Sequence, residues 1–138
     1  MEQYTNPSER YRLAREIAEE GIILLKNQGN ILPIGKHKLA VFGRTQIDLI
    51  PCGTGSALCH GEYCIDILTG LEEEGLLFDH ELADAYRRFS AENPVSCFGV
   101  WGSGSHIQPE MALTEEMVAK TVSDGADTAL VVIGRTAG

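Results

Sequence analysis

The last thirteen residues, 126–138, constrain the fold of this chain more than any other stretch. Residues 128–133 are apolar and mostly β-branched, which predicts a strand buried on both faces. The strand leads directly into a loop of mostly small residues, Gly-Arg-Thr-Ala-Gly, at positions 134–138. Because open α/β sheets bind ligands at the carboxyl ends of their strands, this loop is the first candidate site.

The remaining sequence alternates between helix and strand patterns. Asn6 as a cap and Pro7 in the first turn predict a helix start, and an apolar stripe extends the helix to Leu25 and predicts that one face packs on a neighbour. Residues 38–43 predict the first buried strand, since Pro33 prevents an earlier restart of regular structure.

The second half continues the same alternation. A short helix is expected to end at Gly75, followed by a strand at 76–78 and a helix from His80 to Phe89 whose apolar stripe faces inward. Thr114 should cap a last helix that precedes the final strand, with a buried side formed by Met117, Val118, Thr121 and Val122. Residues 44–63 and 92–109 are predicted to be long loops. The predicted fold class is α/β: a three-layer α/β/α sandwich with a flavodoxin-like, mostly parallel sheet, forming a single domain over residues 1–138.

Composition excludes several classes of partner. Twenty acidic residues against eleven basic ones give a formal charge of −9, which opposes binding to nucleic acid and to anionic membrane surfaces. No stretch has the length of a membrane span and no signal peptide is recognisable, so a cytoplasmic location is predicted. The four cysteines are expected to be free thiols in such a chain.

Two cofactor motifs fail on spacing. Gly53 and Gly55 begin a G-x-G-x-x-G pattern, but Leu58 occupies its third glycine and the loop lies ten residues beyond the strand, so a dinucleotide is rejected. No phosphate-binding G-K-[ST] ending follows either glycine cluster. A metal site is not expected either, because Cys52, Cys59, His60 and Cys64 lack two compact ligand pairs. No cofactor is therefore expected.

Side chains for catalysis are not evident from the pattern alone. No G-x-S-x-G nucleophile elbow is present, and the acidic residues fall on helices where a solvated face explains them. The histidines are expected at the surface. Trp101, in the second long loop, is either a platform on which a sugar ring stacks or an anchor of the loop on the core.

Three stretches together resemble a known family. Residues 16–27, followed by Ile-Leu-Pro-Ile at 31–34 and Leu-Ala-Val-Phe-Gly at 39–43, resemble the opening of the α/β sandwich domain of family 3 glycoside hydrolases. Gly53, Thr54, Gly55 and Ser56 resemble that family's glycine-serine loop, and residues 126–138 resemble the strand and loop that lead to its acid/base.

The resemblance implies a retaining glycosidase of the β-glucosidase type as parent. In this family an aspartate on a separate (β/α)8 barrel attacks the sugar, and a glutamate from the sandwich domain is the acid/base. That glutamate is expected just after Gly138, so no catalytic residue is expected within residues 1–138, and the chain alone should be inactive. The implied pocket-lining residues are Gly53, Thr54, Gly55, Ser56 and Arg135 with the loop that follows it, and Trp101 is the additional candidate from the residues themselves.

The implied partners are a β-glucoside or oligosaccharide in the parent enzyme and the missing barrel domain, on either side of this one along the chain. An apolar surface should be exposed where the barrel docks, unless the chain covers it by forming a homo-oligomer. The alternative is a stand-alone flavodoxin-like binding or interaction module without hydrolase activity.

Overall fold

The structure, a computed structural model, describes residues 7–51, 64–98 and 105–134. The chain divides into two compact units, Met1–Ile34 and Gly35–Gly138. No helix among the described residues combines the length and the apolar character needed to cross a membrane. The predicted single domain over residues 1–138 stays a prediction.

The first unit contains helix α1 (Pro7–Gly21) and the 3₁₀ turn η1 (Gln28–Asn30). The predicted extension of the helix to Leu25 is wrong, because Gly21 and the β-branched pair that follows it favour other backbone conformations. The predicted packing of its apolar stripe is not seen within this unit, where Leu13 and Ile17 are 47% and 62% exposed. Asn6, the predicted cap, lies outside the described residues.

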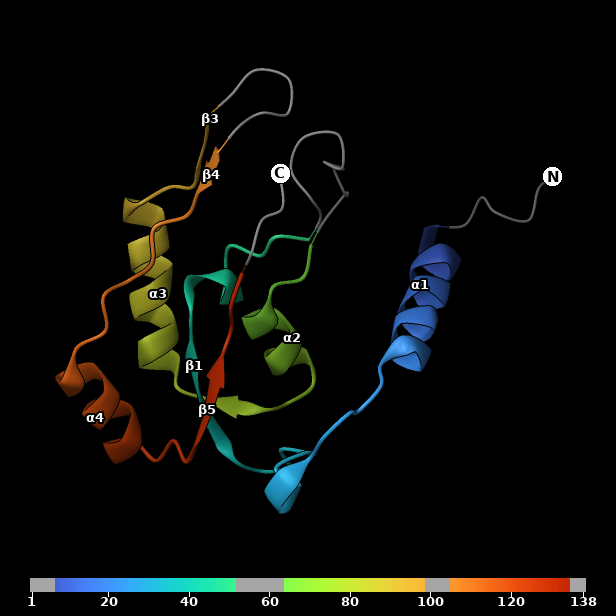
Figure 1. The fold of residues 1–138 in the computed structure, drawn as a ribbon, viewed down its shortest axis with the longest axis horizontal. Coiled ribbons are helices and arrows are strands. Elements are labelled where there is room, and N and C mark those ends of the chain that lie inside the picture. The colour runs from blue at the N-terminus through green and yellow to red at the C-terminus, as the bar shows by residue number, and fades with distance from the viewer. Residues whose placement is uncertain (1–6, 52–63, 99–104, 135–138) are drawn as a thin grey trace. The chain divides into compact units, whose positions relative to one another are not determined.

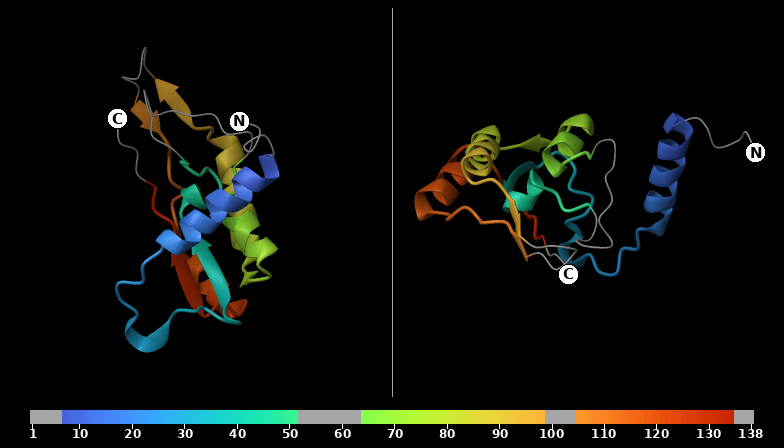
Figure 2. Two further views of the ribbon diagram at one scale, coloured as in Figure 1. Left: turned by 90° about the vertical axis from the view of Figure 1, so that its right-hand side faces the viewer. Right: turned by 90° about the horizontal axis from the view of Figure 1, so that it is seen from above.

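The second unit is built on a parallel sheet in the order β2-β1-β5, which confirms the predicted α/β class. Strand β1 (Lys38–Phe42) lies between β2 (Leu77–Phe78) and β5 (Thr128–Val131). Helices α3 (His80–Glu92) and α4 (Glu115–Ser123) cover one face, and α2 (Ile67–Glu73) covers the other (Figures 1 and 2). The described part therefore has the three layers that the sequence predicts.

The described α-helices of the second unit, α2, α3 and α4, each begin at a side chain that accepts a backbone hydrogen bond. Asp66 accepts from the N–H of Thr69 at 2.7 Å, Asp79 accepts at the start of α3, and the predicted cap Thr114 accepts at the start of α4. Such caps satisfy backbone donors that have no partner inside the helix. The helix starts are therefore fixed locally, before any packing on the sheet.

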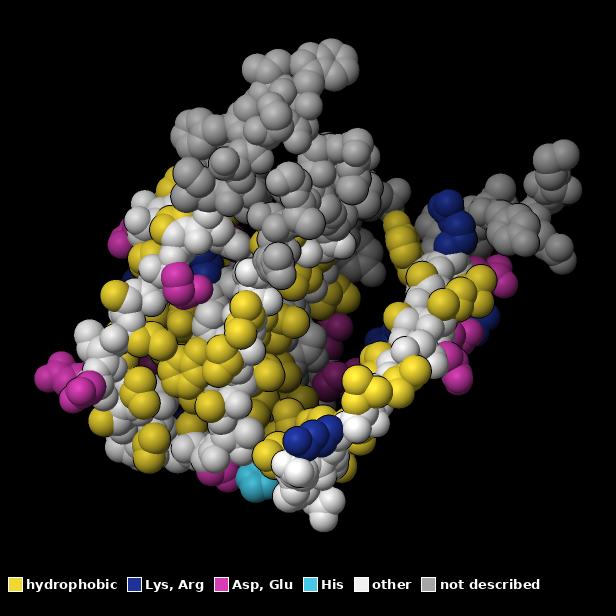
Figure 3. Space-filling model, viewed as in Figure 1, with side chains coloured by type: hydrophobic (Ala, Val, Ile, Leu, Met, Phe, Trp, Pro, Cys, Tyr) yellow, Lys and Arg dark blue, Asp and Glu magenta, His cyan; other side chains and the backbone are white. Residues whose placement is uncertain are grey.

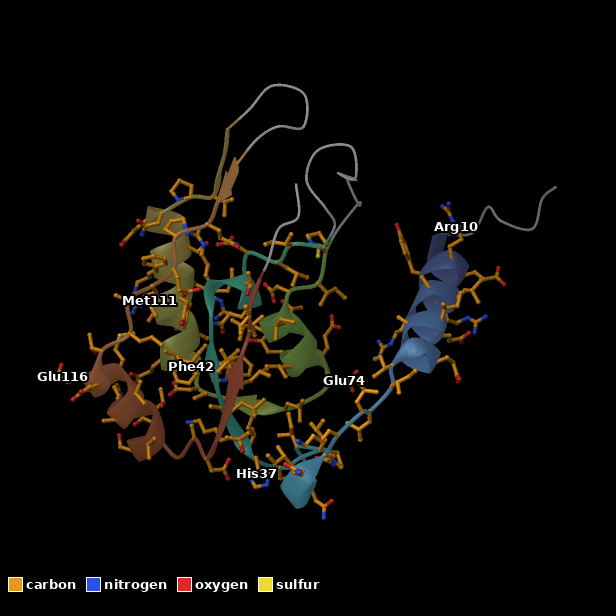
Figure 4. The ribbon with its side chains drawn as sticks, viewed as in Figure 1. Arg10, His37, Phe42, Glu74, Met111 and Glu116 are labelled. Atoms are coloured by element: carbon orange, nitrogen blue, oxygen red, sulfur yellow. The ribbon has the colours of Figure 1, made fainter. Side chains whose placement is uncertain are left out.

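The core on the α3 side joins the sheet to the helix through Ala40, Leu82, Tyr86 and Ala126, all buried. The predicted inward stripe of α3 is confirmed at Leu82, Ala83 and Tyr86. Figure 4 shows Phe42 and Met111 on this same side of the sheet, where both pack against the core cluster.

Strand β5 differs from the prediction that it is buried on both faces. Its alternate residues Ala129 and Val131 are exposed, Val131 to 61%. Their register partners on β1 are Ala40 and Phe42, so both point to the face that carries α3 and α4. β5 forms an edge of the described sheet, so these side chains have no neighbouring strand on one side.

Two further predictions need correction. The buried side of α4 consists of Thr121 with Met117 partly buried, whereas Val118 and Val122 are 41% and 64% exposed. The predicted loop 92–109 contains a short antiparallel hairpin of β3 (Ser96–Phe98) and β4 (Ser105–Ile107). Strands of three residues are too short to show the alternation that identifies a strand in a sequence.

Candidate functional site

The carboxyl end of β1 turns sharply into a 3₁₀ helix, η2 (Arg44–Gln46), at Gly43. Gly43 has φ +100°, and a Cβ placed on it would lie 2.0 Å from the carbonyl oxygen of Val132. Only glycine allows this combination of backbone conformation and close approach. The turn therefore brings η2 directly against the carboxyl end of β5.

All three residues of η2 are buried, although all three are polar. The Thr45 hydroxyl donates to the Val132 carbonyl at 3.0 Å, and the Gln46 amide donates to the carbonyls of Val41 and Gly43 at 3.1 and 2.9 Å. Buried polar groups are tolerated when they are hydrogen bonded in this way. η2 thus ties the ends of the two neighbouring strands together.

A polar cluster joins η2 to the residues that follow β4. The Arg44 guanidinium donates through Nε to Asp48 at 2.6 Å and through Nη1 to the Pro109 carbonyl at 3.0 Å. The backbone N–H of Arg44 donates to the Glu110 carboxylate at 2.9 Å. The segment after β4 is therefore held beside the carboxyl end of β1.

Tyr86 extends this cluster to α3. Its hydroxyl accepts a hydrogen bond from the Gly43 N–H at 2.9 Å. Burial raises the pKa of Tyr86 above its usual 10, and the negative charge of the nearby Glu110 carboxylate raises it further. Tyr86 is thus a neutral hydroxyl at the centre of the cluster throughout the physiological pH range.

The residues named as substrate-binding from the sequence lie outside the described part of the chain. Gly53, Thr54, Gly55 and Ser56 fall in 52–63, and Trp101 and Arg135 fall in 99–104 and 135–138. Their assignment stays a prediction. The described segments that lead toward them, 47–51, 105–110 and 132–134, all contact η2 or the Gly43 turn, or continue directly from them.

The sequence did not identify Arg44, Gln46 and Glu110 as residues at the carboxyl edge of the sheet. One signal was available, because Gly-Arg-Thr follows both β1 and β5, at 43–45 and at 134–136. Because neighbouring parallel strands end at the same edge of a sheet, a tripeptide that recurs after both strands marks that edge in the sequence. No comparable signal identifies Glu110, which stands in a segment without periodicity.

A second polar group of this unit, Lys120, is already partnered. The hollow between α3 and α4 contains Lys120, which contacts Glu81 at 2.8 Å and Asp124 at 2.9 Å. These hydrogen bonds, with Glu81 first, raise the pKa of Lys120. Within the described ranges, no group of three His, Cys, Asp or Glu side chains could hold a metal ion, and Cys64 is exposed.

An apolar surface lies on the face of the sheet that carries α3 and α4. It consists of Val118 and Val122 of α4 and Val131 of β5, with Phe42 and Met111 partly buried on the same face. Figure 3 shows hydrophobic side chains gathered beside α4 on this face. The apolar surface predicted for domain docking has a counterpart here, and none of the described residues of the second unit covers these exposed side chains.

Comparison with known families gives one match over most of the chain. Residues 22–138 match the model of the glycosyl hydrolase family 3 C-terminal domain. Among curated proteins, a β-glucosidase of Ruminococcus albus is 38% identical over 127 residues, which cover 91% of this chain and 13% of that protein. β-Glucosidase A of Butyrivibrio fibrisolvens is 32% identical over 138 residues, which cover 99% of this chain and 16% of that protein.

Solved structures agree with these relatives. A β-glucosidase from Paenibacillus barengoltzii superposes with a TM-score of 0.80 at 40% identity, covering 92% of this chain and 14% of the other. β-Glucosidase 3B from Thermotoga neapolitana in complex with α-D-glucose gives a TM-score of 0.78 at 34% identity, covering 95% of this chain and 18% of the other. The chain thus spans less than a fifth of the length of the proteins that it resembles.

Proposed function

Because the chain belongs to glycosyl hydrolase family 3, we propose that it forms one wall of the sugar site in a β-glucosidase-like enzyme and supports the acid/base loop. The parent reaction is retaining hydrolysis of terminal β-D-glucosides. The observation that carries the proposal is the likeness to β-glucosidases over more than nine-tenths of the chain.

The geometry of the carboxyl edge supports the proposed role. η2 follows directly on β1 and donates hydrogen bonds to the carboxyl end of β5 and to the segment after β4. Three chain segments that leave this edge carry the candidate residues Ser56, Trp101 and Arg135. Carboxyl ends of parallel strands are where sheets of this class bind ligands.

The chemistry needs two carboxylates, and the chain is proposed to supply neither. A retaining glycosidase uses a nucleophile and an acid/base about 5 Å apart on opposite sides of the glycosidic bond. The nucleophilic aspartate belongs to a (β/α)8 barrel, and the glutamate belongs to the loop that residues 134–138 begin. The chain alone therefore positions groups around the sugar without catalysing hydrolysis.

The exposed apolar surface supports docking of that barrel. Val122 and Val131 are each more than 60% exposed. Interfaces between domains of one chain bury about 600–1,500 Å², and a surface of this kind is what such an interface covers.

A pair of assays with 4-nitrophenyl β-D-glucopyranoside tests the proposal. The 138-residue chain should show no turnover above a mock purification. A chimera in which residues 22–138 replace the matching segment of the Ruminococcus albus β-glucosidase should hydrolyse the substrate. Turnover by the chain alone would contradict the proposed division of labour. A folded but inactive chimera would favour a binding module without hydrolase activity.

A further inference from the structure

We propose that Arg44 and Glu110 form a clamp that fixes the segment after β4, residues 108–111, beside η2 and so positions the β3–β4 hairpin at the sugar site. This inference rests on the proposed function for the identity of the site, but the clamp itself rests on contacts within the chain. Both residues are positioning residues, since each acts on backbone groups rather than on a reacting atom.

The burial of Arg44 indicates a role in geometry rather than in stability. Its side chain is 1% exposed and its guanidinium carbon lies 5.7 Å from the centroid of the Phe89 ring. Its Nη2 is buried without a hydrogen-bond partner among the described residues. Removing such a charge from water is costly, and a buried ion pair replaced as a whole by apolar side chains often leaves a protein as stable or more so. What an apolar residue cannot do is hold Asp48 and the Pro109 carbonyl in fixed directions.

Glu110 closes the clamp from the other side. One carboxylate oxygen accepts the backbone N–H of Arg44 and the other accepts the backbone N–H of Met111, each at 2.9 Å. The negative charge of this carboxylate also raises the pKa of the Tyr86 hydroxyl of α3. A single carboxylate thus fixes the segment 108–111 against η2 and lies near α3.

The clamp acts on the hairpin through the chain itself. Ile107 is the last residue of β4 and Gln108 follows it, with its side-chain amide bonded to the Asp48 carbonyl at 2.7 Å. Together with the Pro109 carbonyl and Glu110, three consecutive residues are therefore anchored to 44–48. A shift of this segment displaces β4, the strand that precedes it, and Trp101 lies between β3 and β4 in the sequence.

The 138-residue chain itself provides the first test, because Trp101 is its only tryptophan. Arg44→Met and Glu110→Gln should both change the emission maximum of Trp101 and its quenching by acrylamide, with the far-ultraviolet circular dichroism unchanged. Arg87→Met and Glu116→Gln are matched controls, since both remove an exposed charge from a helix, and neither should change the emission. Figure 4 shows Glu116 on α4, outside the cluster.

The titration of Tyr86 is a second readout, and it distinguishes loss of the clamp from a general loss of stability. Glu110→Gln removes the negative charge that raises the pKa of Tyr86, so the alkaline absorbance titration of that tyrosine should move to lower pH. The difference spectrum against Tyr86→Phe isolates it from the other tyrosines. Glu116→Gln should leave the titration unchanged.

The active chimera provides the test at the sugar site. A shift of about 1 Å in a positioned group can cost on the order of a hundredfold in rate, so kcat/KM should fall about ten- to a hundredfold in Arg44→Met, mainly through KM. A variant with unchanged Trp101 emission and unchanged KM would overturn the clamp. An inactive wild-type chimera would instead contradict the proposed function, while the emission and titration measurements would still decide on the clamp.

Discussion

The two ends of strand β1 carry polar side-chain contacts of nearly the same length in opposite surroundings. At the carboxyl end, Arg44 lies 2.6 Å from Asp48 and is 1% exposed. At the amino end, labelled by His37 in Figure 4, His37 lies 2.7 Å from Asp127 and both side chains are more than half exposed. Burial, rather than distance, decides what such contacts contribute, because water screens the exposed pair. The carboxyl end should therefore be sensitive to substitution and the amino end tolerant.

The largest expected effect is at the Gly43 turn. Gly43→Ala introduces a Cβ that would lie 2.0 Å from the Val132 carbonyl, at a φ of +100° that alanine rarely adopts. Backbone strain and the forced separation of β1 from β5 should together cost about 2–4 kcal/mol in the free energy of unfolding. Urea denaturation followed by circular dichroism measures it.

Gly125 provides the matched control for this prediction. It has φ +89°, but a Cβ added to it would meet nothing within 4 Å, so Gly125→Ala isolates the backbone strain from the clash. It should cost about 1–2 kcal/mol. Equal effects of the two substitutions would show that close contact of the strand ends is not what Gly43 permits.

A smaller loss is expected from Tyr86→Phe. The substitution keeps the ring in the core but leaves the Gly43 N–H and the Glu110 carboxylate without the hydroxyl. A partly buried donor that loses its partner costs about 1–2 kcal/mol. Ser123→Ala on α4 is the control, because it removes a hydroxyl whose hydrogen bond to the Lys120 carbonyl is exposed, and it should have a smaller effect. Equal losses would place the Tyr86 hydroxyl outside the stabilising cluster.

The same tyrosine predicts a dependence on alkaline pH. The folded chain favours the protonated phenol, since burial and Glu110 raise the pKa of Tyr86 above 10. Its contribution to stability is therefore complete below pH 10 and is lost as pH rises through the raised value. Wild-type chain should lose more stability than Tyr86→Phe above pH 10 in urea denaturation. Parallel pH profiles for the two would contradict the shift.

Local patterns predicted the parts of the fold that are determined locally. The stripe of α3 and the cap at Thr114 were readable because helical period and capping need only neighbouring residues. The exposure of Val131 could not be predicted from the sequence, because the burial of a strand depends on which elements pack beside it. The order of elements was enough to predict a site at the carboxyl edge of the sheet. It did not predict that Arg44 is buried there, since arginine is normally expected at the surface.

The smallest effect is expected at the amino end of β1. The hydrogen bond from His37 lowers the pKa of Asp127 below its usual value. Any stability from this carboxylate is present above pH 4 and is lost as pH falls through the lowered value. Asp127→Asn should nevertheless change the melting temperature least of these substitutions, and 1 M salt should reduce the change, since the screening length for exposed charges is only about 3 Å at that concentration. The loss caused by Tyr86→Phe should persist in the same salt, because a partly buried hydrogen bond is not screened. If Asp127→Asn were as costly as Tyr86→Phe, burial would not be what distinguishes the two ends of the strand, and the case for the carboxyl edge as the site would lose its physical basis.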